Sequence, residues 1–345
     1  MKHIKTLSLI LTILTSAPSM APCSRVVLCG DSADVVVVGR TLDWRTPIPT
    51  NIYVYPAGMT RVSMPDGPRF EWVSRYNSVL AVSYDSGVTE GMNQCGLVVN
   101  GLFCRGSRYR VAPAGSDTPV MSLALFVSYF LDNFATVDEV EAFLDENDFG
   151  MEASDFDGGT ATLLHWAITD ATGNTLIMEF VGGELQVYVD RNYRVLTNEP
   201  QFPAMQSILS YWTGIGGNNM LPGGVRSSDR FVRASYFVNH VPAPRSADEA
   251  VAVASSIINN VSVPMGYEIP GQPNLSSTQW RSISDASRGR YYMQFADSGG
   301  MFYVDLSTLE LSSGKVLKLD TSNHADFFGC VNHLLRPSAP FTPHW

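Results

Sequence analysis

Cys23 combines a residue type and a position that suit nucleophilic chemistry. It follows residues 1–22, which have the features of a removable leader. Without that leader, Cys23 is the N-terminal residue and offers both a thiol and an α-amine. An amine with a pKa of about 7.7 can take the proton of a thiol whose ordinary pKa is about 8.5, and the thiolate is a strong nucleophile. The alternative is that Cys23 is only the first residue of a buried strand.

Arg40 and Asp43 belong to the block Gly39-Arg40-Thr41-Leu42-Asp43-Trp44, which follows the first predicted hairpin. Strand pairing brings both residues back beside Cys23. A carboxylate such as that of Asp43 can hold the α-amine, and a guanidinium such as that of Arg40 favours the thiolate. An ordinary salt bridge is the simpler explanation of the same spacing.

Other catalytic motifs are incomplete. Gly30-Asp31-Ser32 follows a strand as in GDSL-type serine esterases, with Ser32 as the nucleophile, but the expected Asp-x-x-His near the C-terminus is missing. There is no G-x-S-x-G, H-E-x-x-H or G-x-x-x-x-G-K motif. His165, in an apolar strand, is interpreted as a hydrogen-bonded core residue.

The cysteines and histidines predict no metal site and no cofactor. The four cysteines after Cys23 form no C-x-x-C pair, and the six histidines lack ligand spacing. In an exported protein these four could form disulfides, with a pairing that the sequence leaves open; they are Cys29, Cys95, Cys104 and Cys330.

The elements that must position these residues fall into blocks of strands and blocks of helices. Helices are predicted from Pro119 to Phe134, from Thr136 to Leu144 and from Ser246 to Ile258, the last two opened by capping boxes. A Gly-rich loop is expected between residues 197 and 246. Blocks of this kind favour an α+β fold of antiparallel sheets covered by helix layers. Strands are predicted at residues 25–29, 35–38, 51–55, 79–84, 96–103, 161–169, 175–180, 184–189, 194–197, 290–295, 301–306 and 316–319.

Residues 1–22 predict a signal peptide or propeptide. Lys2 and Lys5 precede the apolar run from Leu7 to Leu14, and small residues follow it. We therefore expect an exported protein, periplasmic or secreted, in which residues 23–345 form a single domain. Pro22 disfavours direct signal-peptidase cleavage, so a second trimming step is expected. No later run approaches the roughly 20 apolar residues of a membrane span.

Composition limits the partners. Without the leader, 323 residues remain, with 21 basic side chains against 33 acidic ones. Such a surface repels phosphate backbones, so no nucleic-acid partner is expected. Across the whole chain, 45% of residues are hydrophobic, enough for a large core.

Six ordered blocks resemble those of the choloylglycine hydrolases, which include bile salt hydrolases and penicillin V acylases within the N-terminal nucleophile (Ntn) hydrolases. The resemblance implies a four-layer αββα sandwich of two antiparallel sheets, hydrolysis of linear amides without a metal, and a homotetramer. The leader and Trp44 are most similar to the exported Gram-negative branch. The blocks are C-S-R from Cys23, G-R-T-L-D-W from Gly39, G-M-N-Q-C-G-L from Gly91, L-H-W-A-I-T-D from Leu164, V-L-T-N-E-P-Q-F from Val195 and L-P-G-G-V-R-S-S-D-R-F from Leu221.

The same resemblance implies roles for individual residues. Cys23 is then the nucleophile with Arg40 and Asp43 beside it, Asn198 an oxyanion donor and Arg230 a support of the site. The chain departs from the family at Phe103, where many members have Asn or Tyr. Asn100 could replace that polar contact, but in a regular strand it lies on the opposite face. The second oxyanion donor is therefore left open.

The function hypothesis is acyl transfer through a Cys23 thioester. Trp44 and Phe103 predict an aromatic-walled acyl pocket that favours penicillin V or a similar aryl- or fatty-acyl amide, unless both rings are only core packing. Alternatives within the family are conjugated bile salts and N-acyl homoserine lactones. Outside it, they are a GDSL-type esterase and a non-catalytic binding protein with the same fold.

Overall fold

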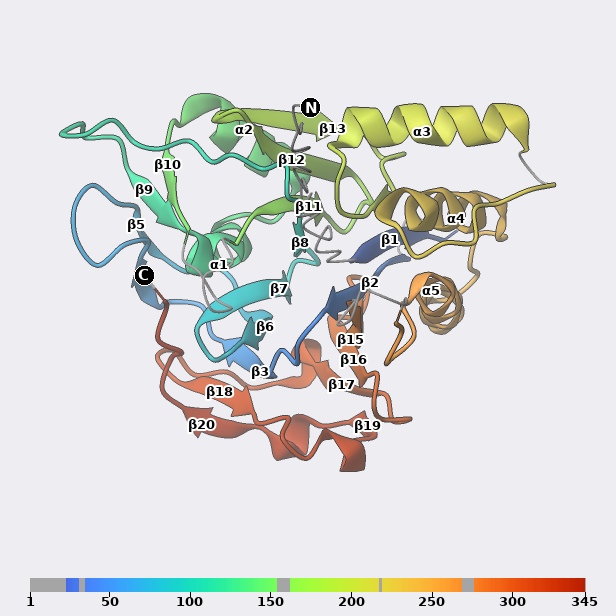
Figure 1. The fold of residues 1–345 in the computed structure, drawn as a ribbon. Coiled ribbons are helices and arrows are strands. Elements are labelled where there is room, and N and C mark those ends of the chain that lie inside the picture. Colours follow the sequence, from blue (N-terminus) through green and yellow to red (C-terminus); the bar gives the residue numbers. More distant parts are fainter. Residues whose placement is uncertain (1–22, 31–34, 154–161, 217–218, 269–275, 345) are drawn as a thin grey trace, which may run out of the picture.

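Two large sheets stack face to face between two layers of helices, which makes the fold a four-layer αββα sandwich (Figure 1). The computed structural model describes residues 23–30, 35–153, 162–216, 219–268 and 276–344. Two sequence-based predictions, the leader at residues 1–22 and the esterase nucleophile Ser32, lie outside the described residues. No helix among the described residues combines the length and apolarity needed to cross a bilayer.

The seven-stranded sheet carries the N-terminal strand in its interior. All its neighbouring strands are antiparallel except the last pair. In spatial order they are β14 (Val195–Leu196), β1 (Ser24–Cys29), β2 (Val36–Trp44), β15 (Ser277–Asp285), β16 (Arg290–Phe295), β17 (Phe302–Asp305) and β19 (Gly329–Cys330).

The nine-stranded sheet is antiparallel throughout. Its order is β13 (Glu184–Val189), β12 (Thr175–Val181), β11 (Leu164–Thr169), β8 (Val98–Phe103), β7 (Gly87–Asn93), β6 (Ser78–Ser83), β3 (Thr50–Tyr55), β18 (Val316–Leu319) and β20 (Arg336–Ser338). Two small sheets pair β4 (Thr60–Val62) with β5 (Glu71–Val73) and β9 (Val120–Ser122) with β10 (Gly150–Glu152). Within the part of the chain that the structure describes, 3₁₀ turns lie at Leu306–Thr308, His324–Asp326 and Asn332–Leu334.

Helices cover the outer face of each sheet. α1 (Leu123–Asn133) and α2 (Val137–Glu146) pack on the nine-stranded sheet. The seven-stranded sheet is covered by α4 (Ser227–His240) and α5 (Ala247–Val261), and α3 (Phe202–Ile215) packs against α4. β1 shows the two-residue period that this layering requires, because Val26 and Leu28 face the helices while Val27 faces the other sheet.

Two capping boxes predicted from the sequence are confirmed. Thr136 Oγ1 accepts from the Glu139 N–H at 3.2 Å, and Ser246 accepts from the Glu249 N–H at the same distance. The helix predicted from Pro119 begins instead at Leu123, because Val120–Ser122 pairs with β10 as a strand.

The Gly-rich loop expected between residues 197 and 246 is wrong, because α3 and α4 occupy most of it. α3 buries only Phe202 and Met205, and no side chain caps its N-terminus. Its N-terminus therefore lacks the side-chain cap that marks the start of a helix in a sequence. Met205, Ile208, Leu209 and Trp212 do have helical spacing, so the sequence carried a usable signal for this helix. The strands β7 and β15 were also not predicted from the sequence.

Candidate active site

Cys23 lies at the start of an interior strand, and the β1–β2 hairpin brings its neighbours into place. Ser24 pairs with Thr41 and Arg25 with Arg40. The Cys23 side chain is buried, with Sγ 3.8 Å from Arg40 Nη2 and 3.9 Å from the backbone oxygen of Asp43. A cation thus faces the thiol directly.

Arg40 is fixed on three sides. Its Nη1 lies 2.6 Å from Glu90 Oε2, and its Nη2 donates to the Gly101 carbonyl at 2.8 Å. The guanidinium carbon lies 5.1 Å from the Trp280 ring centroid. Burial alone would lower the pKa of Arg40, but Glu90 and Cys23 outweigh it and raise the pKa, so the group stays cationic.

Glu90 is the centre of a buried polar network between the two sheets. Its Oε1 accepts from Tyr291 OH at 2.6 Å and from Ser282, while its Oε2 accepts from Asn100 Nδ2 at 3.0 Å in addition to Arg40. The carboxylate is fully buried. Glu90 therefore holds the guanidinium that faces the thiol.

Asn100 lies in this network and is absent from the residues that line the pocket. Its Oδ1 accepts from Arg25 Nε at 2.8 Å. Burial lowers the pKa of Arg25 to about 9, against the attraction of Glu90. The predicted opposite orientation of Asn100 and Phe103 is present, because Asn100 faces Arg25 in the other sheet and Phe103 faces the pocket.

Asn198 follows β14 and contacts the backbone of Cys23. Its Oδ1 accepts from the Cys23 N–H at 2.5 Å and from Arg230 Nη2 at 2.8 Å. Its Nδ2 donates to the Phe103 carbonyl at 2.8 Å. An amide nitrogen carries two hydrogens, so Nδ2 has a second one to offer to a substrate oxygen.

Arg230 holds the first two residues of β1. Its Nη1 donates to the Cys23 carbonyl at 2.6 Å and to Ser24 Oγ at 2.5 Å. Burial lowers the pKa of Arg230, while Asp43 and Cys23 counteract this. The structure therefore brings Arg230, Asn198 and Cys23 together from separate segments of the chain.

The Asp43 carboxylate is held by hydroxyl groups. Thr41 Oγ1 donates to Oδ2 at 3.0 Å and Thr278 Oγ1 to Oδ1 at 2.5 Å. Burial raises the pKa of Asp43 to about 6, although Arg230 and both threonines oppose the shift. The Cys23 nitrogen, which sequence reasoning assigned to the Asp43 carboxylate, bonds to Asn198 in this chain.

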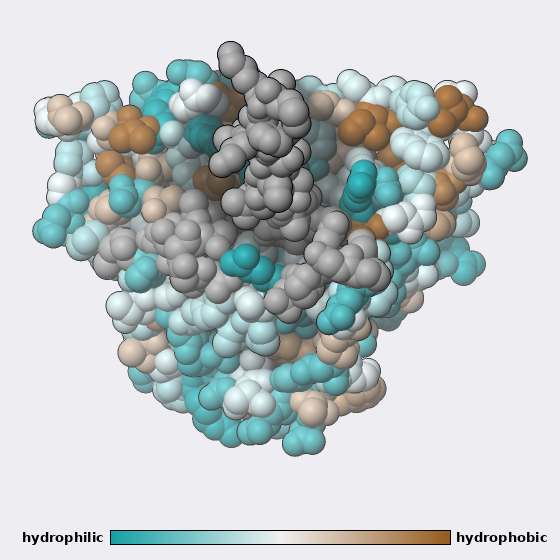
Figure 2. Space-filling view, viewed as in Figure 1, coloured by the Kyte–Doolittle hydropathy of each residue, from teal (hydrophilic) through white to brown (hydrophobic). Residues whose placement is uncertain are grey.

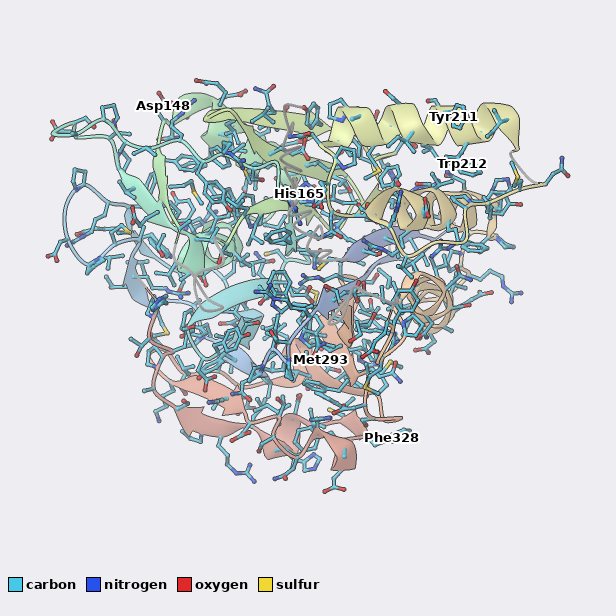
Figure 3. All side chains as sticks on the ribbon, in the orientation of Figure 1. Asp148, His165, Tyr211, Trp212, Met293 and Phe328 are labelled. Carbon is cyan, nitrogen blue, oxygen red and sulfur yellow. The ribbon has the colours of Figure 1, made fainter. Side chains whose placement is uncertain are left out.

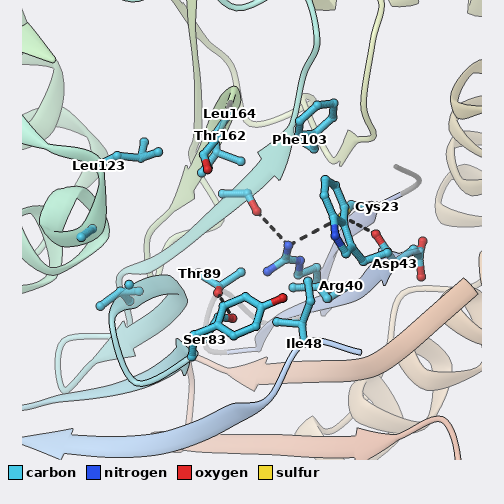
Figure 4. Close-up of a pocket in the computed structure, with 17 residues that line it drawn as sticks. Cys23, Arg40, Asp43, Ile48, Ser83, Thr89, Phe103, Leu123, Thr162 and Leu164 are labelled. Atoms are coloured by element: carbon cyan, nitrogen blue, oxygen red, sulfur yellow. Dashed lines mark hydrogen bonds between the residues drawn. The ribbon is translucent and has the colours of Figure 1, made fainter. Parts of the chain in front are cut away.

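A largely apolar pocket of about 120 Å³ opens beside the thiol (Figure 4). The Trp44 and Phe103 rings meet edge to face in it, with centroids 5.4 Å apart. Of the polar residues in its lining, Ser83 and Thr89 bond to each other at 2.7 Å. The remaining lining residues are Arg40, Leu42, Asp43, Ile48, Tyr84, Gly87, Val88, Gly101, Leu123, Ala124, Thr162 and Leu164.

One other cluster of chemically capable groups is buried among the described residues. Ligand-type atoms of Cys104, His165 and Glu179 lie within 4.8 Å of one another. Both ring nitrogens of His165 already have protein partners, Glu179 and the Thr197 carbonyl. A metal ion would have to break one of these bonds, so the cluster is better described as a hydrogen-bonded unit.

All five cysteines are free thiols, so none of the four after Cys23 forms a disulfide in this structure.

Sequence reasoning missed Glu90, Glu179 and Thr278. The two carboxylates carried a usable signal, since each stands in an apolar strand where an uncompensated charge is costly. Thr278 carried no such signal in the sequence, because threonine is common in strands of every kind.

Known proteins are similar to this chain over most of its length. The family described as linear amide C-N hydrolases, choloylglycine hydrolase family, matches residues 23–325, a range that begins at Cys23. Penicillin V acylase from Pectobacterium atrosepticum is 34% identical over 357 residues, which cover 97% of this chain and 95% of that protein. The bile salt hydrolase/transferase of Clostridium perfringens is 25% identical, covering 66% of this chain and 75% of that protein.

The fold has a solved counterpart. The structure of penicillin V acylase from Agrobacterium tumefaciens matches with a TM-score of 0.85 and 38% sequence identity, over 93% of this chain and 99% of that chain.

Proposed function

This chain belongs to the choloylglycine hydrolase family of linear amide C-N hydrolases, and we propose that it cleaves acyl amides through a thioester on Cys23. The observation that carries the proposal is the Cys23 thiol, which lies 3.8 Å from a fixed guanidinium at the wall of an apolar pocket. Nucleophile, cation and acyl site are thus adjacent, as acyl transfer requires.

In the proposed reaction the free α-amine of Cys23 takes the thiol proton, and the thiolate attacks the amide carbonyl. The second Nδ2 hydrogen of Asn198 stabilises the oxyanion. The α-ammonium then protonates the leaving amine as the C–N bond breaks, which leaves a thioester. Water adds to the thioester with the amine as base, and the acid and the free thiol are released.

The proposed substrates are amides of aryl or other apolar acids, with penicillin V as the reference compound. The Trp44–Phe103 pair offers flat apolar surface, and the Ser83 and Thr89 hydroxyls are occupied with each other. A hydroxylated steroid would bury its hydroxyl groups against few partners here, which costs binding energy. The Pectobacterium and Agrobacterium relatives are penicillin V acylases, which supports the same choice.

We further propose that residues 1–22 direct export to the periplasm or medium and that removing them exposes Cys23. The charged, apolar and small-residue regions of this stretch support export. The family match that begins at Cys23 supports processing at that position.

A homotetramer is the proposed assembly, with α3 as a contact surface. α3 has no charged residue, and its exposed side chains include Tyr211 and Ile215; Met220, five residues further along the chain, is also exposed. Figure 3 labels Tyr211 on this helix. Apolar side chains gather over this helix at the upper right of Figure 2. An apolar face of this kind is typical of a protein–protein contact.

The test is hydrolysis of penicillin V, taurocholate, glycocholate and an N-acyl homoserine lactone by protein whose N-terminal residue is verified as Cys23. Cys23→Ala should abolish amine release because the attacking atom is gone. Asn198→Ala should lower kcat by about 10²- to 10³-fold.

Ser32→Ala is the matched control and should retain most activity. Loss of activity in folded Ser32→Ala, with Cys23→Ala active, would establish the esterase alternative. A higher kcat/KM for taurocholate or glycocholate than for penicillin V would contradict the substrate proposal and leave the thioester mechanism intact.

A further inference from the structure

Asn198 lies on a short segment that is held at both ends by one pair of buried side chains. The segment, Thr197–Phe202, joins β14 to the first residue of α3. His165 on β11 and Glu179 on β12 reach it from the nine-stranded sheet. Figure 3 shows His165 in the interior of the molecule, and its side chain is fully buried.

The contacts of this pair form a continuous chain of hydrogen bonds. His165 Nε2 lies 2.7 Å from the Thr197 carbonyl oxygen, and His165 Nδ1 lies 2.8 Å from Glu179 Oε1. Both oxygens of Glu179 accept from the Phe202 N–H, at 3.1 and 3.0 Å. The pair therefore fixes the carbonyl just before Asn198 and the nitrogen four residues after it.

The geometry sets the charge of His165. A carbonyl oxygen and a carboxylate are both acceptors, so each ring nitrogen must carry a hydrogen, and the ring is an imidazolium. Cys104 is a second nearby partner, and although burial raises the pKa of its thiol, His165 lowers it below its ordinary value. Burial would lower the pKa of His165, yet Cys104 and Glu179 raise it to about 10. Among the described residues, two further titratable groups interact with these partners: Tyr188 with Glu179 and Tyr109 with Cys104.

We propose that His165 and Glu179 are positioning residues for amide hydrolysis, a clamp that holds Asn198 at the distance from Cys23 that catalysis needs. The inference rests on the proposed function of Cys23 and Asn198. The Thr197 carbonyl belongs to the peptide unit that also contains the Asn198 nitrogen. Rotation of this peptide unit therefore moves the side-chain amide of Asn198. That amide contacts Cys23 and Phe103, so both contacts change.

The position of the Asn198 side-chain amide affects the rate of amide hydrolysis more than the binding of the substrate. A displacement of about 1 Å at a catalytic group can cost about 10²-fold in rate. The apolar pocket that binds the acyl group lies elsewhere and is not lined by His165 or Glu179. Loss of the clamp should therefore lower kcat and leave KM nearly unchanged.

The experiment compares His165→Gln and Glu179→Gln with the processed wild-type enzyme on penicillin V. His165→Gln should lower kcat about 10²-fold with KM within about twofold. In Glu179→Gln the imidazolium loses its carboxylate, so its pKa falls. A new alkaline limb should then appear in the kcat profile between about pH 7 and 9, where the wild type has none from this group.

His324→Gln is the control, since it removes a second imidazole–carboxylate pair, 2.8 Å from Asp297, outside the site. It should leave kcat and the pH profile unchanged. Unchanged kcat in folded His165→Gln, or no new limb in Glu179→Gln, overturns the clamp.

A readout without substrate completes the test. Nitrogen-15 spectra of the wild-type imidazoles should show both His165 nitrogens protonated at pH 8, and a neutral ring would overturn the proposal even if neither variant folds. If the wild type cleaves none of the four amides, the proposed function fails, while the spectra still decide the protonation state on which the clamp depends.

Discussion

Glu90 balances two guanidinium groups inside the protein. It bonds directly to Arg40 and reaches Arg25 through Asn100. All four side chains are buried. Removing the negative charge would leave two cations between the sheets with no carboxylate bonded to them, and an uncompensated buried charge is among the costliest defects in a folded protein.

Glu90→Gln should therefore lower the free energy of unfolding by about 3–5 kcal/mol, measured by urea denaturation. Glu71→Gln is the matched control, because Glu71 pairs with Arg69 at 2.8 Å on the surface. That change should cost less than about 1 kcal/mol. Equal effects of the two substitutions would contradict the assigned importance of the buried network.

Asp43 makes stability depend on pH. Because burial raises its pKa from 3.8 to about 6, the folded protein holds this proton more tightly than the unfolded chain does. The stabilisation is complete below about pH 4, falls as the pH rises to about 6 and is absent above that. Asp43→Asn should lack this fall, a difference of up to about 3 kcal/mol between pH 4 and 7 in urea denaturation. Parallel pH profiles for the two proteins would show that Asp43 ionises normally.

The immediate surroundings of the nucleophile could be predicted because they are local. The second strand of one hairpin carries both Arg40 and Asp43 and brings them close to Cys23. The partners of Glu90 could not be predicted from the sequence, because Ser282 and Tyr291 are 192 and 201 residues away from it along the chain. No local pattern specifies which distant strands become neighbours. The family resemblance supplied Asn198 and Arg230, which spacing alone would not have linked to Cys23.

At the scale of elements, α1 packs so closely on β7 that one position admits no side chain. A Cβ at Gly91 would lie 2.5 Å from the Val79 carbonyl oxygen and 2.8 Å from Leu131 Cδ1 on α1. The backbone oxygen cannot move without disturbing the β6–β7 ladder. Gly91 thus lets β6, β7 and α1 meet.

Gly91→Ala should destabilise the fold by about 1–3 kcal/mol in thermal or urea unfolding, because the added methyl group overpacks this contact. Gly214→Ala is the opposite case, since nothing lies within 4 Å of a Cβ there and the residue is in α3. Alanine should stabilise that position by up to about 1 kcal/mol. A neutral Gly91→Ala would mean that α1 can shift away from the sheet.

Elements with their own signals were predictable, and those stabilised by packing alone were not. α2 and α5 carry capping boxes and an apolar stripe. β15 interrupts its apolar residues with polar ones that point into the buried network, so its strand pattern is broken. Its pairing with β2 and β16 supplies what local propensity lacks.

At the scale of the whole molecule, α3 is the proposed contact between copies of the chain. Ile215→Glu should disrupt the proposed tetramer, because a charge on an apolar interface loses its hydration, and light scattering would report a lower mass. Phe328→Glu is the control, since Phe328 is 81% exposed and lies on the far side from α3 (Figure 3). The same mass for wild type and Ile215→Glu would remove α3 from the interface.

The place of β15 in the seven-stranded sheet also governs when the enzyme becomes competent. Thr278 bonds to Asp43 from 235 residues away, and Trp280 supplies the ring beneath Arg40. A chain made from its N-terminus contains Cys23 early and β15 late, and contacts so distant in sequence close slowly. A growing chain therefore carries the Cys23 thiol before β15 has supplied Thr278 and Trp280 to its surroundings.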